Sequence, residues 1–185
     1  MRRDILKSLE EHQFKGPALP EFDFSVKNPT NLLDRFSASA KASASDILDD
    51  NKINDLLAKF NQVVNLSEQI DYKGQSLHGI RTPYELGDID LLIMDGVFGV
   101  AENGAIWVES ESLPFRVLPF IAEHLVICIK KSNLVANMHD AYAKINADTY
   151  GFGVFIAGPS KTADIEQSLV IGAQGPRSLG ILLST

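Results

Sequence analysis

Apolar residues in the later part of the chain fall into short runs that are separated by glycines and polar residues. The clearest runs cover residues 62–66, 89–94, 105–109, 125–129, 154–157 and 181–183. Several of them are apolar at both odd and even positions, which is typical of strands buried on both faces of a sheet. The pattern therefore predicts a largely buried β-sheet.

Segments in which apolar residues have helical spacing lie between these runs. Residues 134–145 predict a helix whose inner face consists of Leu134, Met138, Ala141, Tyr142 and Ile145. A second, shorter helix is predicted to begin near Thr162, with Ile165 and Leu169 facing inward. Because strands alternate with helices, the pattern predicts an α/β fold, a three-layer α/β/α sandwich.

The N-terminal part of the chain has a different pattern. Residues 1–12 predict a short amphipathic helix that ends before Gly16. The sequence KGPALPEFDF over residues 15–24 contains prolines and phenylalanines and predicts an extended arm laid over a surface.

Further helices are predicted before the first strand. One opens at residues 28–30, and the Ala/Ser-rich residues 37–45 either continue it or form a mobile link. Another is predicted over residues 46–60. We expect one domain overall, in which an N-terminal helical arm (residues 1–60) packs on a core domain (residues 61–185).

Composition narrows the class of protein. Hydrophobic residues make up 45% and charged residues 22% of the 185 residues, as in ordinary globular proteins. The net charge of -7 argues against a nucleic-acid partner or an anionic membrane surface. No run approaches the roughly 18–20 apolar residues of a membrane helix, and the first residues do not resemble a signal peptide. We therefore expect a cytoplasmic protein without a membrane partner.

The single cysteine, Cys128, excludes an intrachain disulfide and an iron–sulfur cluster held by this chain alone, since such clusters need about four thiolates. Cys128 itself is interpreted as a buried small hydrophobe. His12, His78, His124 and His139 show no paired spacing, so we predict no metal site and no cofactor. His124 and His139 are interpreted as surface or packed residues.

The segment that bears most on chemistry is an apolar strand that runs directly into Gly158, Pro159, Ser160, Lys161 and Thr162. One interpretation is a ligand pocket at the carboxyl end of a strand. Gly158 would allow close approach, and the hydroxyls of Ser160 and Thr162 would join Lys161 in holding a carboxylate or phosphate. The other interpretation is a capped strand-to-helix turn without a ligand.

Neighbouring residues extend this candidate site. Asp164 falls in the first turn of the predicted helix, where its carboxylate suits the positive helix end. Gly175 belongs to a tight turn over residues 172–177. Arg177 ends that turn and is either a clamp for a carboxylate or an ordinary exposed arginine.

A turn at residues 101–104 is the third candidate. Asn103 and Gly104 form a strong hairpin signal and predict a type I′ turn. Glu102 stands between apolar segments, where a buried carboxylate needs a partner or a role. It is therefore either a general base or ligand anchor, with Gly104 beside the ligand, or a satisfied structural carboxylate.

These motifs resemble a known family. GVFGVAENGAIWVES (residues 96–110) resembles a turn of LUD-domain proteins. FIAGPSKTADIEQSLVIGAQGPRSLGILL (residues 155–183) resembles the C-terminal signature of the lactate-utilization protein C family (LutC/YkgG). Gln174 stands where that family often has histidine, and Asn103 where it usually has threonine or serine.

The resemblance implies a fold similar to the NagB/RpiA/CoA-transferase-like group. It also implies a non-redox accessory subunit in L-lactate oxidation to pyruvate, acting beside iron–sulfur partner subunits (LutA/LutB-like). We expect such a subunit to bind a small carboxylate or a partner through Ser160, Lys161 and Thr162. Arg177 would then support the charge, and Glu102 would orient the ligand hydroxyl or act as a base.

Alternatives remain at this point. One alternative is a stand-alone enzyme acting on a small phosphorylated or CoA-linked substrate. Another is an interaction module with a vestigial pocket. The residues do not decide whether the chain is an enzyme or whether it forms a homo-oligomer.

Overall fold

A computed structural model describes residue 7 and residues 31–145, 151–165 and 168–185 of the chain. The helix predicted over residues 1–12, apart from residue 7, and the arm predicted over residues 15–24 lie outside the described residues.

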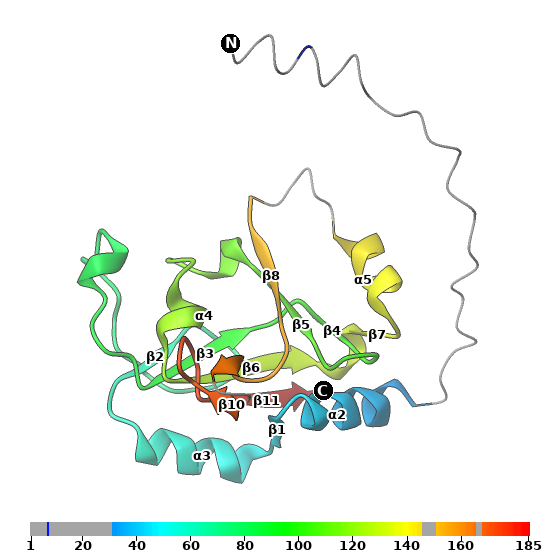
Figure 1. The fold of residues 1–185 in the computed structure, drawn as a ribbon. Helices are drawn as coiled ribbons and strands as arrows, with labels where there is room; N and C mark the ends of the chain where they lie inside the picture. Colours follow the sequence, from blue (N-terminus) through cyan, green and yellow to red (C-terminus); the bar gives the residue numbers. More distant parts are fainter. Residues whose placement is uncertain (1–6, 8–30, 146–150, 166–167) are drawn as a thin grey trace.

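The centre of the molecule is a five-stranded sheet in which every neighbouring pair of strands is parallel (Figure 1). Its strand order is β1-β11-β6-β3-β2. The strands are β1 (Ser45–Leu48), β11 (Ser178–Ser184), β6 (His124–Lys130), β3 (Leu91–Asp95) and β2 (Val63–Asn65). The predicted α/β class is confirmed, because helices flank this central parallel sheet.

Alternate residues of the central strands enter two separate cores, as expected for strands buried on both faces. Leu92 and Ile127 belong to the larger core, whereas Leu91 and Val126 belong to the smaller one. On the side of the smaller core lies α3 (Asp50–Lys59), which contributes Ile53.

A second, four-stranded sheet lies on the opposite side of the central sheet from α3 (Figure 1). Its order is β7-β4-β5-β8, with β7 (Leu134–Val135), β4 (Phe98–Val100), β5 (Ile106–Glu109) and β8 (Gly153–Ile156). The helices α2 (Leu32–Ala42) and α4 (Leu118–Ile121) add Phe36 and Leu118 to the same core. The last helix, α5 (Met138–Lys144), packs on the second sheet through Ala141.

Local sequence signals account for the helix starts. The side chains of Asn31, Asp49 and Asn137 each accept a hydrogen bond from a backbone N–H in the first turn of α2, α3 and α5, respectively. Such caps satisfy donors that the helix itself leaves unpaired. Short 3-10 turns occupy Pro83–Glu85, Ser110–Ser112 and Lys131–Asn133.

The structure corrects the helix predicted over residues 46–60. Residues 46–48 belong to β1, which pairs with β11, and the helix begins only at Asp50. The Ala/Ser-rich residues continue α2 as far as Ala42, and Ser45 then opens β1. Residues 134–135 likewise form β7 rather than the start of the helix predicted there.

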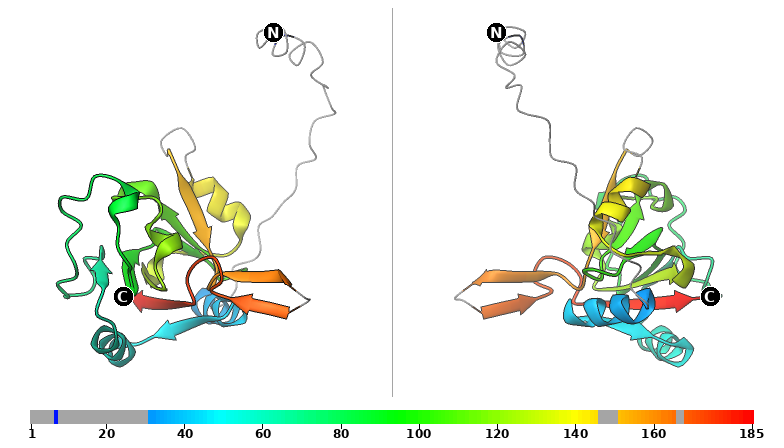
Figure 2. Two further views of the ribbon diagram at one scale, coloured as in Figure 1. Left: turned by 60° about the vertical axis from the view of Figure 1, so that its left-hand side comes forward. Right: turned by 90° about the vertical axis from the view of Figure 1, so that its right-hand side faces the viewer.

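The helix predicted from Thr162 is also wrong. This segment contains β9 (Lys161–Ile165) and β10 (Ser168–Ile171), which pair antiparallel and extend away from the rest of the molecule (Figure 2). Beta-branched residues such as Thr162, Ile165 and Val170 favour strands over helices. The spacing of Ile165 and Leu169 suggested a helix, but a short apolar run does not discriminate between the two states.

Candidate functional site

The Gly158–Lys161 loop packs on the C-terminal end of α2. Gly158 has a φ of +76°, and a Cβ built there would lie 1.9 Å from the carbonyl oxygen of Ser43. The same carbonyl oxygen accepts a hydrogen bond from Nζ of Lys161. Glycine is therefore required at position 158 by backbone conformation and by close approach, and Lys161 is engaged with the backbone.

The turn that contains Glu102 meets the same end of α2. Gly104 has a φ of +71°, and a Cβ built there would lie 2.5 Å from the backbone nitrogen of Ala40. Oγ of Ser39 donates to the carbonyl oxygen of Ala101 at 2.9 Å. Asn103 does not have a positive φ, so the predicted type I′ turn, which needs positive φ at both central residues, is wrong.

Glu102 holds the start of another helix. Its Oε2 accepts a hydrogen bond from the backbone N–H of Met138 at 3.0 Å, at the first residue of α5. The side chain is exposed rather than enclosed in a pocket. This contact gives the carboxylate a hydrogen-bond partner, as the interpretation of a satisfied structural carboxylate expects.

Ser160, Gly175 and Arg177 gather on another side of the loop. The backbone N–H of Ser160 donates to the carbonyl oxygen of Pro176 at 2.8 Å, and a Cβ on Gly175 would lie 3.1 Å from Cβ of Ser160. Arg177 forms an ion pair with Glu123, at 2.6 Å between Nη1 and Oε1. In this state the guanidinium already has a carboxylate partner.

The remaining predicted residues lie on β9. Thr162 pairs with Val170 of β10, and Asp164 lies further along the same strand. Because a strand replaces the predicted helix, neither residue occupies a helix N-terminus. The dipole argument for an anion at this loop is therefore lost.

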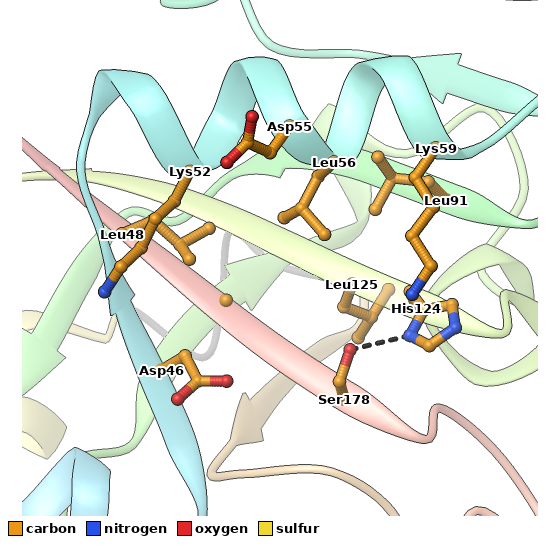
Figure 3. A pocket seen from close by; sticks show the side chains of 11 residues that line it. Asp46, Leu48, Lys52, Asp55, Leu56, Lys59, Leu91, His124, Leu125 and Ser178 are labelled. Carbon is orange, nitrogen blue, oxygen red and sulfur yellow. Dashed lines mark hydrogen bonds between the residues drawn. The ribbon is translucent and has the colours of Figure 1, made fainter.

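A cavity of about 370 Å³ lies elsewhere, between α3 and the central sheet (Figure 3). It opens beside the strands β1, β6 and β11 and has charged groups from Asp46, Lys52, Asp55 and Lys59. Its apolar lining comes from Leu48, Leu56, Leu91, Leu125 and Gly180. None of the predicted loop residues belongs to the described lining of this cavity.

The most notable pair in the cavity is His124 and Ser178. Their side chains are joined by a hydrogen bond of 2.7 Å between Nδ1 and Oγ (Figure 3). The ring of Phe60 lies against the imidazole, at 4.6 Å between ring centroids. His124, interpreted from the sequence as a surface or packed residue, is thus packed beside Phe60 and at the same time lines a cavity.

Burial lowers the pKa of His124 below its ordinary value. The charge of Glu123 opposes this shift, while Lys59 and Arg177 add to it. Burial therefore favours the neutral imidazole, which is a hydrogen-bonding group rather than a fixed cation.

Sequence reasoning missed this pair because its two members are distant along the chain. His124 and Ser178 are the first residues of β6 and β11, and the parallel register places them opposite each other. A polar residue at the start of each of two buried strands was a usable signal. The adjacency of the two strands, however, is a property of the folded sheet.

Comparison with known proteins identifies the family. The model of the LUD domain matches residues 51–184. The chain therefore belongs to the LUD-domain family, as its glycine-rich turns indicated.

Curated relatives are named lactate utilization protein C. The proteins from Bacillus pumilus and Shouchella clausii are each 36% identical, over 43% and 50% of this chain. The protein from a Geobacillus species is 31% identical over 64% of this chain. The matches span 35%, 42% and 46% of these three relatives, so the chain corresponds to less than half of each.

A solved structure has the same fold. The crystal structure of a DUF162 family protein from Deinococcus radiodurans matches with a TM-score of 0.57, covering 82% of this chain and 95% of its own. Because the two sequences are only 13% identical, the match shows a similarity of fold alone.

The described residues lack two further features. No helix among them has the length and apolar character needed to cross a membrane. Within the same residues, no group of three or more His, Cys, Asp or Glu side chains is placed to hold a metal ion.

Proposed function

We propose that this chain is an accessory, non-redox component of L-lactate oxidation to pyruvate. The observation that carries the proposal is its similarity, at 31% to 36% identity, to proteins named lactate utilization protein C. Its single cysteine is consistent with this role, since electrons would have to pass through cysteine-rich partner subunits.

The proposed contact region for a small carboxylate or a partner subunit comprises the two turns at the C-terminal end of α2, the strand β9 and the turn that ends at Arg177. Their members are Glu102, Gly104, Gly158, Ser160, Lys161, Thr162, Asp164, Gly175 and Arg177. Lys161 is bonded to a backbone carbonyl and Arg177 to Glu123, so either cation would exchange a present partner for the incoming carboxylate. The β9–β10 hairpin begins at Lys161 and extends outward, which supports a partner contact (Figure 2).

The alternative of a stand-alone enzyme on a phosphorylated or CoA-linked substrate has less support. It relied on a phosphate cradle at the start of a helix after Thr162, and β9 occupies those positions instead. A helix N-terminus would have supplied aligned N–H groups for a phosphate.

Genetic complementation tests the proposal. We expect the full chain to restore growth on L-lactate in a bacterium whose own lactate utilization protein C gene is deleted, and to co-purify with iron-containing partner subunits. Lys161→Met should reduce both readouts, because the variant keeps the aliphatic stem and loses the charge. Lys41→Met, at an exposed lysine in the last turn of α2, is the matched control and should behave like the original chain.

Two results would count against different parts of the proposal, the first against the function and the second against the contact region. One is failure of a folded, expressed chain to restore growth on L-lactate. The other is restored growth that Lys161→Met leaves unchanged, which would remove the loop from the proposal.

A further inference from the structure

We propose that the cavity between α3 and the central sheet binds a small monocarboxylate with an apolar body. The carboxylate would lie at the His124, Ser178 and Lys59 end, and the apolar body would lie over the leucines. This inference goes beyond the proposed function, because it concerns a different place in the molecule and does not require a role in lactate utilization.

The His124–Ser178 pair offers a hydrogen-bond donor whichever tautomer the neutral imidazole adopts. If Nδ1 accepts from the serine hydroxyl, Nε2 carries a free N–H; if Nδ1 donates, the serine hydroxyl is free to donate instead. A carboxylate oxygen is an acceptor and complements either arrangement.

Lys59 supplies the positive charge at the same end. It lies in the last turn of α3, and Figure 3 shows its side chain extending toward His124. Its Nζ lies 5.2 Å from the centroid of the Phe60 ring. Among the described residues Lys59 has no carboxylate within ion-pair distance, whereas nearby Arg177 is already paired with Glu123.

Two acidic groups beside the imidazole have partners of their own. Asp90, whose charge acts on His124, accepts hydrogen bonds from the backbone N–H groups of Asn61 and Gln62. Glu123 faces Arg177. Asp90 and Glu123 are thus held by donors other than Lys59. Asp55 lies one turn before Lys59 on α3 and also lines the cavity, so an incoming anion would share the charge of Lys59 with it.

The rest of the cavity suits an aliphatic body. Leu91 and Leu125 are almost completely buried, at 1% and 2% exposure, and Leu56 of α3 lies opposite them (Figure 3). The volume of about 370 Å³ lies within the usual range for small-molecule sites. Each methylene that enters this lining should improve affinity about fourfold.

The opposite end of the cavity carries one charge of each sign. Asp46 lies there on β1 (Figure 3), and Lys52 beside it donates to the carbonyl oxygen of Ile47 at 3.3 Å. A second carboxylate reaching this end would meet both Asp46, which repels it, and Lys52, which attracts it. It would also lose part of its hydration, and no net positive charge at this end compensates for that loss. We therefore expect hexanoate to bind better than adipate, which has the same number of carbons.

Calorimetry measures the binding of acetate, butanoate, hexanoate and adipate to the full chain. The imidazole NMR signals of His124 report whether the ligand binds in this cavity. Affinity should rise from acetate to hexanoate by about fourfold per methylene, and hexanoate should shift the His124 signals. Lys59→Met should weaken hexanoate binding at least tenfold, and Ser178→Ala several-fold. Lys41→Met, also in the last turn of a helix, should leave binding unchanged.

Several outcomes would overturn the proposal. These are no binding of any probe, affinity that does not rise with chain length, or equal losses in Lys59→Met and Lys41→Met. Thermal unfolding of each variant verifies its fold, and Ser178→Ala provides a second test if Lys59→Met is unstable. Growth on L-lactate is scored separately, so failure of the proposed function and failure of this site give different results.

Discussion

The exposure and the pKa of Cys128 are both set by its position in the core. Its position within an apolar run predicted a buried small hydrophobe, and the structure confirms it, with 0% exposure. Burial raises the pKa of the thiol to about 11, although the Ser67 hydroxyl opposes the shift. The reactive species of cysteine is the thiolate. Burial therefore protects Cys128 from thiol reagents in two ways, because it blocks their access and it suppresses ionisation of the thiol.

Native Cys128 should therefore react slowly with a thiol reagent. At pH 8 we expect labelling by 5,5′-dithiobis(2-nitrobenzoate) to be at least a hundredfold slower in the native chain than in urea. Because the folded-state pKa is raised, the free energy of unfolding should also fall as the pH rises from about 9 toward 11. Rapid labelling of the folded chain would contradict the buried position.

At the scale of elements, Glu102 links a hairpin turn to the start of α5. Its carboxylate accepts from the backbone N–H of Met138 at 3.0 Å, and a negative charge is favourable at that end of a helix. Glu102→Ala should lower the free energy of unfolding by about 1 kcal/mol, and Glu102→Gln by less, because an acceptor oxygen remains. Urea denaturation measures both changes.

The same pair of variants separates structure from catalysis. If Glu102 acts only through α5, growth on L-lactate should follow stability, and Glu102→Gln should be nearly normal. A base would behave differently, since Glu102→Gln would then abolish function while the chain remained stable.

Some elements were predictable from local pattern and others were not. The strands β3 and β6 are continuous apolar runs, and their pattern identifies them without reference to any partner. The strand β1 is different, because Ile47 pairs with Ile181, far away in the sequence. The antiparallel pairing of β9 with β10 likewise overrode an apparent helical spacing.

At the scale of the whole molecule, residues before the LUD match are part of the core. The family model begins at residue 51, yet Phe36 and Ala40 of α2 are both fully buried and β1 forms an edge of the central sheet. A chain of residues 51–185 alone would expose β11 as a new edge and leave a cavity at Phe36. Loss of such an aromatic group by itself costs about 3–5 kcal/mol, a large part of the stability of a typical domain.

We therefore expect residues 51–185 alone to lose cooperative unfolding and to aggregate through the exposed edge. Circular dichroism during urea denaturation and size-exclusion chromatography measure these effects. The full chain carrying Lys41→Ala should unfold within about 0.5 kcal/mol of the original. A soluble 51–185 chain with an unchanged unfolding midpoint would show that α2 and β1 are dispensable.

The candidate site divides in the same way. Gly104 and Gly158 could be picked out from sequence because a positive φ and close approach restrict those positions to glycine. The partners of Lys161 and Arg177 could not be predicted from sequence. Lys161 meets the backbone carbonyl of Ser43, and Arg177 meets Glu123, only in the folded chain.

Local pattern was sufficient for the α/β class, for strands such as β3 and β6 and for the family-like turns, because hydrophobic periodicity and glycine requirements act over a few residues. Tertiary structure alone assigned β1 to the sheet, paired β9 with β10 and placed His124 beside Ser178 in the cavity between α3 and the central sheet. The physical reason is that strand pairing and register depend on contacts between residues far apart in sequence. Such contacts leave no periodic signal in either segment.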